Sequence, residues 1–255
     1  MHEHFLQGLS LENELHGAIE RGEIFIEFQP QFFAADSSLR GFEVLARWDS
    51  PTFGHVVPSK FISVAEHNGD IAKIGNWILE ESIRIYMKMY SKLEKQPVLA
   101  VNVSVIQLHS NSFIDFVHSC LEKYGMNPAN LELELTESVF ANGDFSVKEK
   151  LFALHDELGV MLALDDFGTG YSSLSYLGTM PFDLLKIDKS FVDSISEGPS
   201  NKNLVEPIIV MAHKLGLKVI AEGVENSMQY DYLREQNCDF LQGFYLAKPL
   251  PSAAL

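Results

Sequence analysis

The sequence has little cysteine and no long apolar segment. Its only two cysteines, Cys120 and Cys238, lie far apart without metal-ligand spacing. That usage excludes a disulfide framework and is typical of a reducing compartment. No stretch approaches ~18 uninterrupted apolar residues, the length that a membrane-spanning helix needs. Residues 1–5 form neither a basic region nor an apolar run, which argues against a signal peptide. We therefore expect a cytoplasmic protein, or the cytoplasmic domain of a larger one, with no membrane contact by this segment.

Basic residues are scarce as well. Lys and Arg number 19 against 35 Asp and Glu, which gives a net charge of −16 at pH 7. An acidic surface repels phosphates at long range, and this argues against binding to DNA or to a membrane surface. An acidic protein that acts on a phosphate ester would need local cations, either bound metals or Arg and Lys side chains.

Short β-branched segments alternate with longer amphipathic ones along the whole chain. The predicted strands are residues 25–33, 41–48, 98–105, 131–137, 160–167, 184–187, 218–222 and 240–244. The predicted helices are residues 71–93, 113–124, 147–158, 204–215 and 227–236. This pattern predicts an α/β fold, a (β/α)8 TIM-type barrel. With no linker or internal repeat, we expect a single domain over residues 1–255, with a helical lead-in over residues 1–20.

The link between the first two predicted strands is an exception to this alternation. Residues 34–39 are too few to hold a crossover helix, which parallel neighbouring strands require. The first strand is therefore predicted to run antiparallel to the second.

Two adjacent carboxylates, Asp165 and Asp166, end the fifth predicted strand and precede Gly168-Thr169-Gly170. Neighbouring side chains of a regular strand point to opposite faces, so both carboxylates can serve one site only where the backbone turns. Two carboxylates side by side repel each other, and a divalent cation removes that conflict. Taken alone, such a pair is more often a solvated turn.

Further polar residues lie in or just after the other predicted strands. They are Glu43, Asn102, Glu134, Glu137, Lys186, Glu222, Glu225 and Gln242. The active site of such a barrel forms at the carboxyl ends of its strands, so these side chains are expected to converge. Acidic residues are costly to bury unless they are paired or bound to metal. Oxygen donors without Cys or His favour a hard cation, Mg²⁺ or Mn²⁺.

These residues also carry a specific resemblance to a known family. The motifs are Glu43-Val44-Leu45-Ala46-Arg47-Trp48, Asn102-Val103-Ser104, Glu134-Leu135-Thr136-Glu137-Ser138, Asp165-Asp166-Phe167-Gly168-Thr169-Gly170-Tyr171-Ser172-Ser173, Lys186-Ile187-Asp188, Ala221-Glu222-Gly223-Val224-Glu225 and Gln242-Gly243-Phe244. In this order they resemble the successive motifs of the EAL-domain family, which comprises cyclic di-GMP phosphodiesterases. The resemblance runs from Gln29-Pro30 to Lys248-Pro249-Leu250 and implies hydrolysis of cyclic di-GMP to linear pGpG.

The resemblance implies two bound cations, Mg²⁺ or Mn²⁺. The residues it assigns to one metal are Glu43, Asn102, Glu134 and Asp165. Those it assigns to the second are Asp165, Asp166 and Glu222. Lys186, Glu222 and Glu43 are the implied catalytic residues, with Lys186 orienting the attacking water. Ca²⁺ is expected to bind but inhibit, because it prefers longer bonds and looser geometry.

The resemblance also implies how the substrate is held. Arg47 would contact a phosphate, for which its planar fork is suited. The residues implied to line the dinucleotide are Gln29, Leu45, Glu225 and Gln242. Glu137 would support the loop that begins at Asp166, which in the family couples metal binding to dimer packing. We therefore expect a homodimer, with sensory or regulatory domains either fused or separate.

Three residues depart from the family pattern or lack a role in it. Val44 stands where the signature has Ala and is expected to change packing only, because it points away from Glu43. Gln31 replaces a more usual aliphatic residue. Glu132 shares a strand face with Glu134, one layer deeper, and a buried partner is expected for it rather than a catalytic role.

Two other functions compete with hydrolysis of cyclic di-GMP. A receptor of the same fold could bind the dinucleotide without cutting it, but degenerate members of the family lose metal ligands or the lysine, and here each is present. A generic metal-dependent barrel enzyme acting on a carboxylate substrate would not require Gln29, Arg47 and Gln242 together. The sequence alone does not identify the regulatory input.

Overall fold

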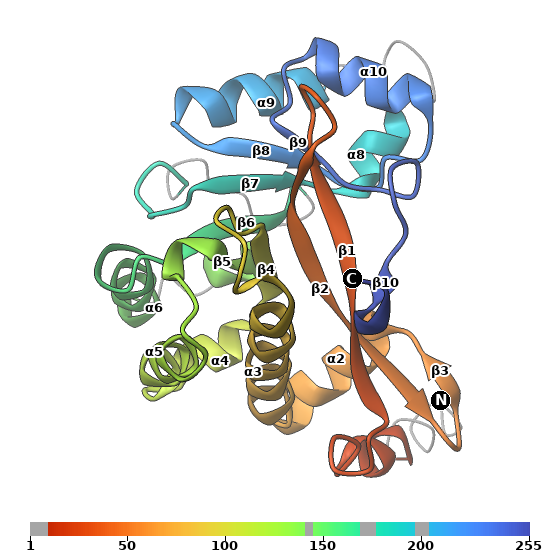
Figure 1. Cartoon of the computed structure of the whole chain (residues 1–255), viewed down its shortest axis with the longest axis vertical. Coiled ribbons are helices and arrows are strands. Elements are labelled where there is room, and N and C mark those ends of the chain that lie inside the picture. The colour runs from red at the N-terminus through yellow and green to blue at the C-terminus, as the bar shows by residue number, and fades with distance from the viewer. Residues whose placement is uncertain (1–9, 141–144, 169–176, 197–203) are drawn as a thin grey trace.

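The computed structural model describes residues 10–140, 145–168, 177–196 and 204–255. Eight strands close into a barrel, in which each strand pairs with the next and the last pairs with the first. They are β1 (Ile24–Phe33), β2 (Leu39–Ser50), β4 (Val98–Asn102), β5 (Leu131–Thr136), β6 (Met161–Phe167), β7 (Leu184–Ile187), β8 (Lys218–Ala221) and β9 (Phe240–Leu241). The predicted barrel is confirmed (Figure 1).

Strand β1 runs antiparallel to both of its barrel neighbours, β2 and β9, and the other barrel pairs are parallel. The antiparallel start was predicted from the short link, and that prediction is confirmed. Two short strands, β3 (Gly54–Val56) and β10 (Leu250–Pro251), extend the sheet beside β2 and β1 and were not predicted.

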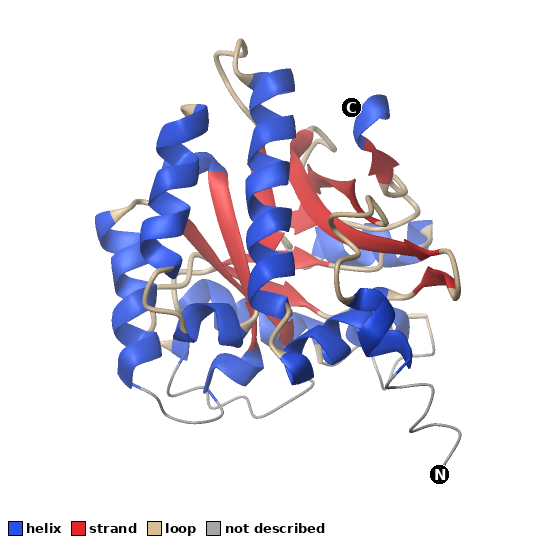
Figure 2. Ribbon diagram, turned by 90° about the horizontal axis from the view of Figure 1, so that it is seen from below, coloured by secondary structure: helices blue, strands red, loops and turns tan. Residues whose placement is uncertain are grey.

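Helices cover the outside of the barrel, as the view of Figure 2 shows. The five predicted helices are present as α3 (Ile71–Tyr90), α5 (Phe113–Tyr124), α6 (Phe145–Phe152), α9 (Val205–Lys214) and α10 (Ser227–Glu235). Among the described residues, helices α2 (Pro58–Asn68), α4 (Val105–His109) and α8 (Lys189–Ser194) were not predicted. Residues 10–15 of the predicted lead-in are helical. In the described part of the chain, no helix combines the length and apolar character that a membrane span requires.

Four predicted strands end earlier than expected, the fourth and seventh by one residue and the third and eighth by three. The third ends at Asn102, because Ser104 begins helix α4 with a capping box in which its side chain and that of Gln107 bond each other's backbone. The eighth ends at Leu241, before Gln242. In both cases the functional polar residue stands at the last strand position or just after it.

The barrel interior is apolar at one level and polar at the next. Ala163, Leu184, Ile220 and Phe240 form a small buried cluster from four adjacent strands. The main core lies on the opposite strand faces, against the helices, and includes Leu162 and Leu185. Because side chains alternate along a strand, the residues two positions further on point inward as well. Those residues are Asp165, Lys186, Glu222 and Gln242, so the candidate site lies inside the barrel toward the carboxyl ends of its strands.

Candidate active site

Lys186 lies at the centre of the site, and its side chain is completely buried. Its Nζ lies 2.7 Å from Glu134 Oε2, 2.8 Å from Glu222 Oε1, 3.2 Å from Asp165 Oδ2 and 3.6 Å from Glu43 Oε1. Burying an ammonium group costs several kcal/mol unless it is paired, and four carboxylates from four strands surround this one. The barrel therefore gathers these predicted residues around one cation.

Glu43 is the most extensively hydrogen-bonded of these carboxylates. Asn102 Nδ2 donates to its Oε1 at 2.9 Å, and Gln242 Nε2 donates to its Oε2 at 2.5 Å. The Gln242 amide also donates to Gln29 Oε1 at 3.3 Å. Gln29 lies opposite Glu43 in the antiparallel register of β1 and β2, which places it beside the site. Both glutamines are buried. Gln242 contacts the acidic cluster directly, and Gln29 contacts it through Gln242.

The two aspartates stand where the end of β6 leaves regular geometry. The pairing of β6 with β7 shifts register between Leu164 and Phe167, and Asp166 has φ 55°, in the left-handed region. The Asp166 amide donates to Asp165 Oδ1 at 2.8 Å. This turn places Asp165 toward Lys186 and Asp166 on the wall of an adjoining cavity. Both carboxylates thus border the site, as predicted for a turn at this point.

Glu137 opens the short turn after β5, and its Oε1 accepts a hydrogen bond from Gly168 N at 2.8 Å. Its side chain thereby contacts the loop that begins at Asp166 and was predicted to couple metal binding to dimer packing. Residues 169–176 lie outside the described residues.

Burial and mutual repulsion shift the pKa values of the carboxylates upward. Burial, and then Asp165 and Glu43, raise the pKa of Glu222 to about 8 against the opposing effect of Lys186. Burial and the Asp165 charge raise the pKa of Asp166 to about 6. For Glu134, burial and the neighbouring carboxylates raise the pKa well above its ordinary value. These carboxylates would ionise more readily if they had an additional cation.

Glu43 and Lys186 are shifted in the directions that favour their charged forms. Burial raises the pKa of Glu43, but the Lys186 ammonium and the hydrogen bonds from Gln242 and Asn102 outweigh it, so the pKa is lowered. Burial lowers the pKa of Lys186, but the carboxylates outweigh it and the pKa lies well above its ordinary value.

The donor set fits hard divalent cations. Five carboxyl groups and one amide border the site, and their oxygen atoms are ligands suited to Mg²⁺ or Mn²⁺. Glu134 Oε1 is buried and has no hydrogen-bond partner among the described residues. Within the described residues, no group of three Asp, Glu, His or Cys side chains is positioned to ligate one ion. The carboxylates of the cluster point at Lys186 instead.

A cavity of about 380 Å³ adjoins the acidic cluster. Leu45 and Arg47 line it together with Asn102, Glu134 and Asp166. Arg47 Nε donates to Glu27 Oε2 at 2.8 Å, and this ion pair holds the guanidinium at the end of β2. Predicted substrate-binding and metal-binding residues thus share one hollow.

Glu225 lies apart from this hollow. Its exposed side chain pairs with Lys189 at the start of α8, and its backbone N–H donates to Gln229 Oε1 at 2.7 Å. The structure therefore holds Glu225 on the rim of the barrel, in the loop that follows Glu222.

Sequence reasoning missed one functional neighbour of the site, Arg40. Its side chain is buried and forms a bidentate ion pair with Glu132 in the barrel interior. The expectation that Glu132 has a buried partner is confirmed. The sequence did carry a signal for Arg40, since it is a charged residue near the start of a largely apolar strand. A charge buried at such a position implies an oppositely charged partner.

Comparison with known proteins identifies the family and supports the fold. The sequence profile of the EAL domain matches residues 12–249. The chain belongs to the EAL domain family. It is 40% identical over 250 residues to the cyclic di-GMP phosphodiesterase NbdA of Pseudomonas aeruginosa, covering 98% of this chain and 32% of NbdA. It is 38% identical over 252 residues to the oxygen sensor protein DosP of Escherichia coli, covering 99% of this chain and 31% of DosP.

A solved structure of an EAL protein is similar throughout. The PaMucR phosphodiesterase in complex with cyclic di-GMP superimposes with a TM-score of 0.90 at 34% identity, covering 96% of this chain and 99% of that chain. The resemblance read from the motifs is therefore confirmed at the level of family and fold. The chain spans about a third of the length of the curated relatives NbdA and DosP.

Proposed function

We propose that this chain hydrolyses cyclic di-GMP to linear pGpG with two Mg²⁺ or Mn²⁺ ions. The observation that carries the proposal is the convergence of four carboxylates on buried Lys186 at the carboxyl ends of the barrel strands. Family membership supports the substrate, because NbdA is named a cyclic di-GMP phosphodiesterase and the PaMucR structure holds the dinucleotide.

The acidic cluster supplies the metal ligands in this proposal. Glu43, Asn102, Glu134 and Asp165 would hold one cation. Asp165, Asp166 and Glu222 would hold the other. When bound, such cations lower the pKa of a water molecule and offset charge on the phosphoryl oxygens. The upward pKa shifts of Glu222 and Asp166 support this use, because ionising them without added positive charge is unfavourable.

Lys186 supplies the protein's own positive charge at the site. It is held by carboxylates on several sides, which fixes the position of its ammonium group. Three donors on a fixed ammonium can orient a water molecule and offset the negative charge that develops on the phosphate. Asn102 orients Glu43 through its side-chain amide.

The substrate would enter from the hollow that Leu45 and Arg47 line. Arg47 presents a guanidinium suited to a phosphate, and its pairing with Glu27 sets its direction. Gln29 and Gln242 border the site from the other side of Glu43, and Glu225 stands on the rim. Dimerisation and coupling to sensory domains belong to the same proposal.

The direct test is incubation of the protein with cyclic di-GMP and Mg²⁺, with the linear product followed by chromatography. Glu43→Gln and Asp165→Asn should each lower turnover at least ~10²-fold, since they remove a ligand and even supporting residues are worth ~10–10²-fold. Glu122→Gln, an exposed carboxylate on α5, is the matched control. Ca²⁺ in place of Mg²⁺ should bind and inhibit.

Each outcome decides between the competing functions. Linear product from the wild type and not from the two variants supports the phosphodiesterase. Tight binding of cyclic di-GMP without product would support the receptor of the same fold. Near-normal turnover by either variant with metal present would contradict the site assignment.

A further inference from the structure

A continuous line of buried hydrogen bonds crosses the barrel interior to Glu43. Arg40 Nη1 donates to Gln31 Oε1, Gln31 Nε2 donates to Gln242 Oε1 at 3.0 Å, and Gln242 Nε2 donates to Glu43 Oε2 at 2.5 Å. Every side chain in it is at most 8% exposed. Glu132 anchors the far end through both of its oxygens.

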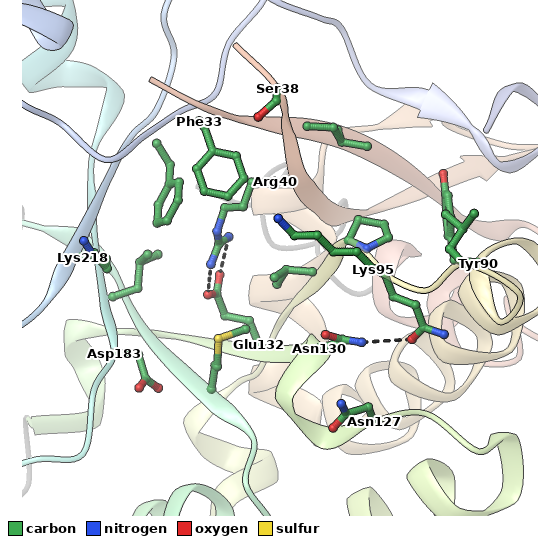
Figure 3. Close-up of a pocket in the computed structure, with 18 of the residues that line it drawn as sticks. Phe33, Ser38, Arg40, Tyr90, Lys95, Asn127, Asn130, Glu132, Asp183 and Lys218 are labelled. Carbon is green, nitrogen blue, oxygen red and sulfur yellow. Dashed lines mark hydrogen bonds and ion pairs between the residues drawn. The ribbon is translucent and has the colours of Figure 1, made fainter. Parts of the chain in front are cut away.

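The far end of this line faces a separate cavity of about 660 Å³ at the amino-terminal ends of the strands. Figure 3 shows Arg40 and Glu132 meeting there, with two dashed contacts between them. The Arg40 guanidinium also lies over the Phe240 ring, 4.5 Å from its centroid. Pairing and stacking together hold this guanidinium in one orientation.

The direction of the hydrogen bonds follows from the first donor. A guanidinium has donors only, so Gln31 must turn its carbonyl oxygen toward Arg40. Its NH₂ group then faces Gln242, which must present its own carbonyl oxygen. The Gln242 NH₂ group is left to face Glu43, where a carboxylate accepts it. One fixed cation thus sets the orientation of two amides in series, and such chains strengthen each other.

We propose that Arg40 and Gln31 are positioning residues: with Glu132 as anchor, they turn the amide of Gln242 so that it donates to Glu43. This inference rests on the proposed role of Glu43 as a metal ligand. Supporting residues that orient a ligand are typically worth ~10–100-fold in metal affinity or activity. The set Glu132, Arg40, Gln31 and Gln242 is called the amide relay below.

A charge-neutral exchange tests the relay. In Gln31→Glu/Glu132→Gln, the same two side chains change places around Arg40, so composition and net charge are unchanged. Position 31 becomes acceptor-only, and the Gln242 oxygen loses its donor. Gln242 would then turn its NH₂ group toward position 31 and its oxygen toward Glu43. We expect Mg²⁺ affinity, measured by calorimetry, to fall ~10–100-fold with a similar loss in kcat.

A second readout needs neither metal nor activity. The side-chain NH₂ resonance of Gln242 in metal-free protein, assigned by its absence in Gln242→Leu, should shift in the exchange variant. The exchange Glu235→Gln/Gln236→Glu at the end of α10 is the matched control and should leave that resonance and Mg²⁺ affinity as in the wild type. An unshifted resonance with unchanged Mg²⁺ affinity in a folded exchange variant would overturn the relay.

A different variant decides the matter if the exchange does not fold. Arg40→Met/Glu132→Met removes the buried pair together, which is often neutral or stabilising. The Mg²⁺ affinity of this variant should still fall. If its Mg²⁺ affinity and its Gln242 NH₂ resonance both equal those of the wild type, the relay is rejected. Should the wild type fail to hydrolyse cyclic di-GMP, the proposed function falls, and the resonance in metal-free protein still decides the relay.

Discussion

Lys186 is the residue on which the charge balance of the site depends. In Lys186→Met, the four carboxylates around position 186 lose their shared cation. Removing one partner of a buried ionic cluster typically costs about 3–5 kcal/mol. We expect the metal-free variant to unfold at lower urea concentration, with a loss of that size in the free energy of unfolding. Mg²⁺ should restore more stability to the variant than it adds to the wild type, because a cation can replace the ammonium charge.

Lys73→Met, which removes an exposed lysine paired with Glu20, is the control and should change stability little. Equal Mg²⁺ stabilisation of wild type and Lys186→Met would show that cation and ammonium do not share the same carboxylates.

The pKa of Glu222 predicts a pH dependence of stability. Its folded-state pKa is about 8 against an ordinary value of 4.5. Between these values the folded protein holds a proton that the unfolded chain has released, so stability falls as pH rises. Urea unfolding with a chelator should therefore show a decline from about pH 5 to about pH 8. Glu222→Gln removes this titration and should make the decline shallower, leaving the part that the raised pKa values of Asp166 and Glu134 contribute, whereas a slope equal to that of the wild type would mean that Glu222 contributes nothing.

Individual site residues differed in how far sequence could place them. Asp165, Lys186 and Glu222 could be assigned, because period-two alternation and strand ends determine which side chains meet inside a barrel. Arg40 could not, since its contact with Glu132 joins positions 92 residues apart across the barrel interior. The turn at Asp166 was expected, but its left-handed φ depends on the shift in register between β6 and β7.

At the scale of the element, helix α10 supports the loop that carries Glu225. Asn226 caps the helix: its Oδ1 accepts from Gln229 N, while Gln229 Oε1 accepts from the backbone N–H groups of Asn226 and Glu225. Asn226→Ala should lower the free energy of unfolding by about 1 kcal/mol, the usual contribution of such a cap. Ser227→Ala, one residue further on the exposed face, is the control. Urea unfolding of both variants measures the difference, and equal stability would mean that the cap contributes nothing.

The missed helices show why short or weakly amphipathic helices are harder to predict than long ones. Helix α2 has clear end signals, Pro58 in its first turn and Gly69 in the left-handed conformation after it. It buries only Phe61 and Ala65, so its hydrophobic periodicity is weak. Helix α4 spans just five residues, and only its capping box marks it. Long helices such as α3, with many buried positions, were predictable from the same rule.

At the scale of the whole molecule, topology explains how distant motifs form one site. Parallel pairing from β2 to β9 brings the carboxyl ends of those strands to the same rim, so polar residues at or near these strand ends lie close together. The fold was predictable because this pattern repeats along the chain. That pattern does not encode assembly or regulation, and the chain spans only about a third of its curated relatives.

The remaining prediction concerns assembly of the whole molecule. Glu137 Oε1 holds Gly168 N at 2.8 Å, at the start of a segment that follows the two aspartates directly. We expect a homodimer in which metal binding and dimer contacts bias the same two states of the protein, so that each favours the other. Glu137→Ala should then weaken both Mg²⁺ affinity and dimerisation, although Glu137 is not itself assigned as a ligand. Glu149→Ala, an exposed carboxylate on α6, is the control and should behave as the wild type. Sedimentation velocity of all three proteins, with and without Mg²⁺, measures the coupling. A strictly monomeric wild type with full activity would rule the coupling out, and Glu137 would then act within one subunit only.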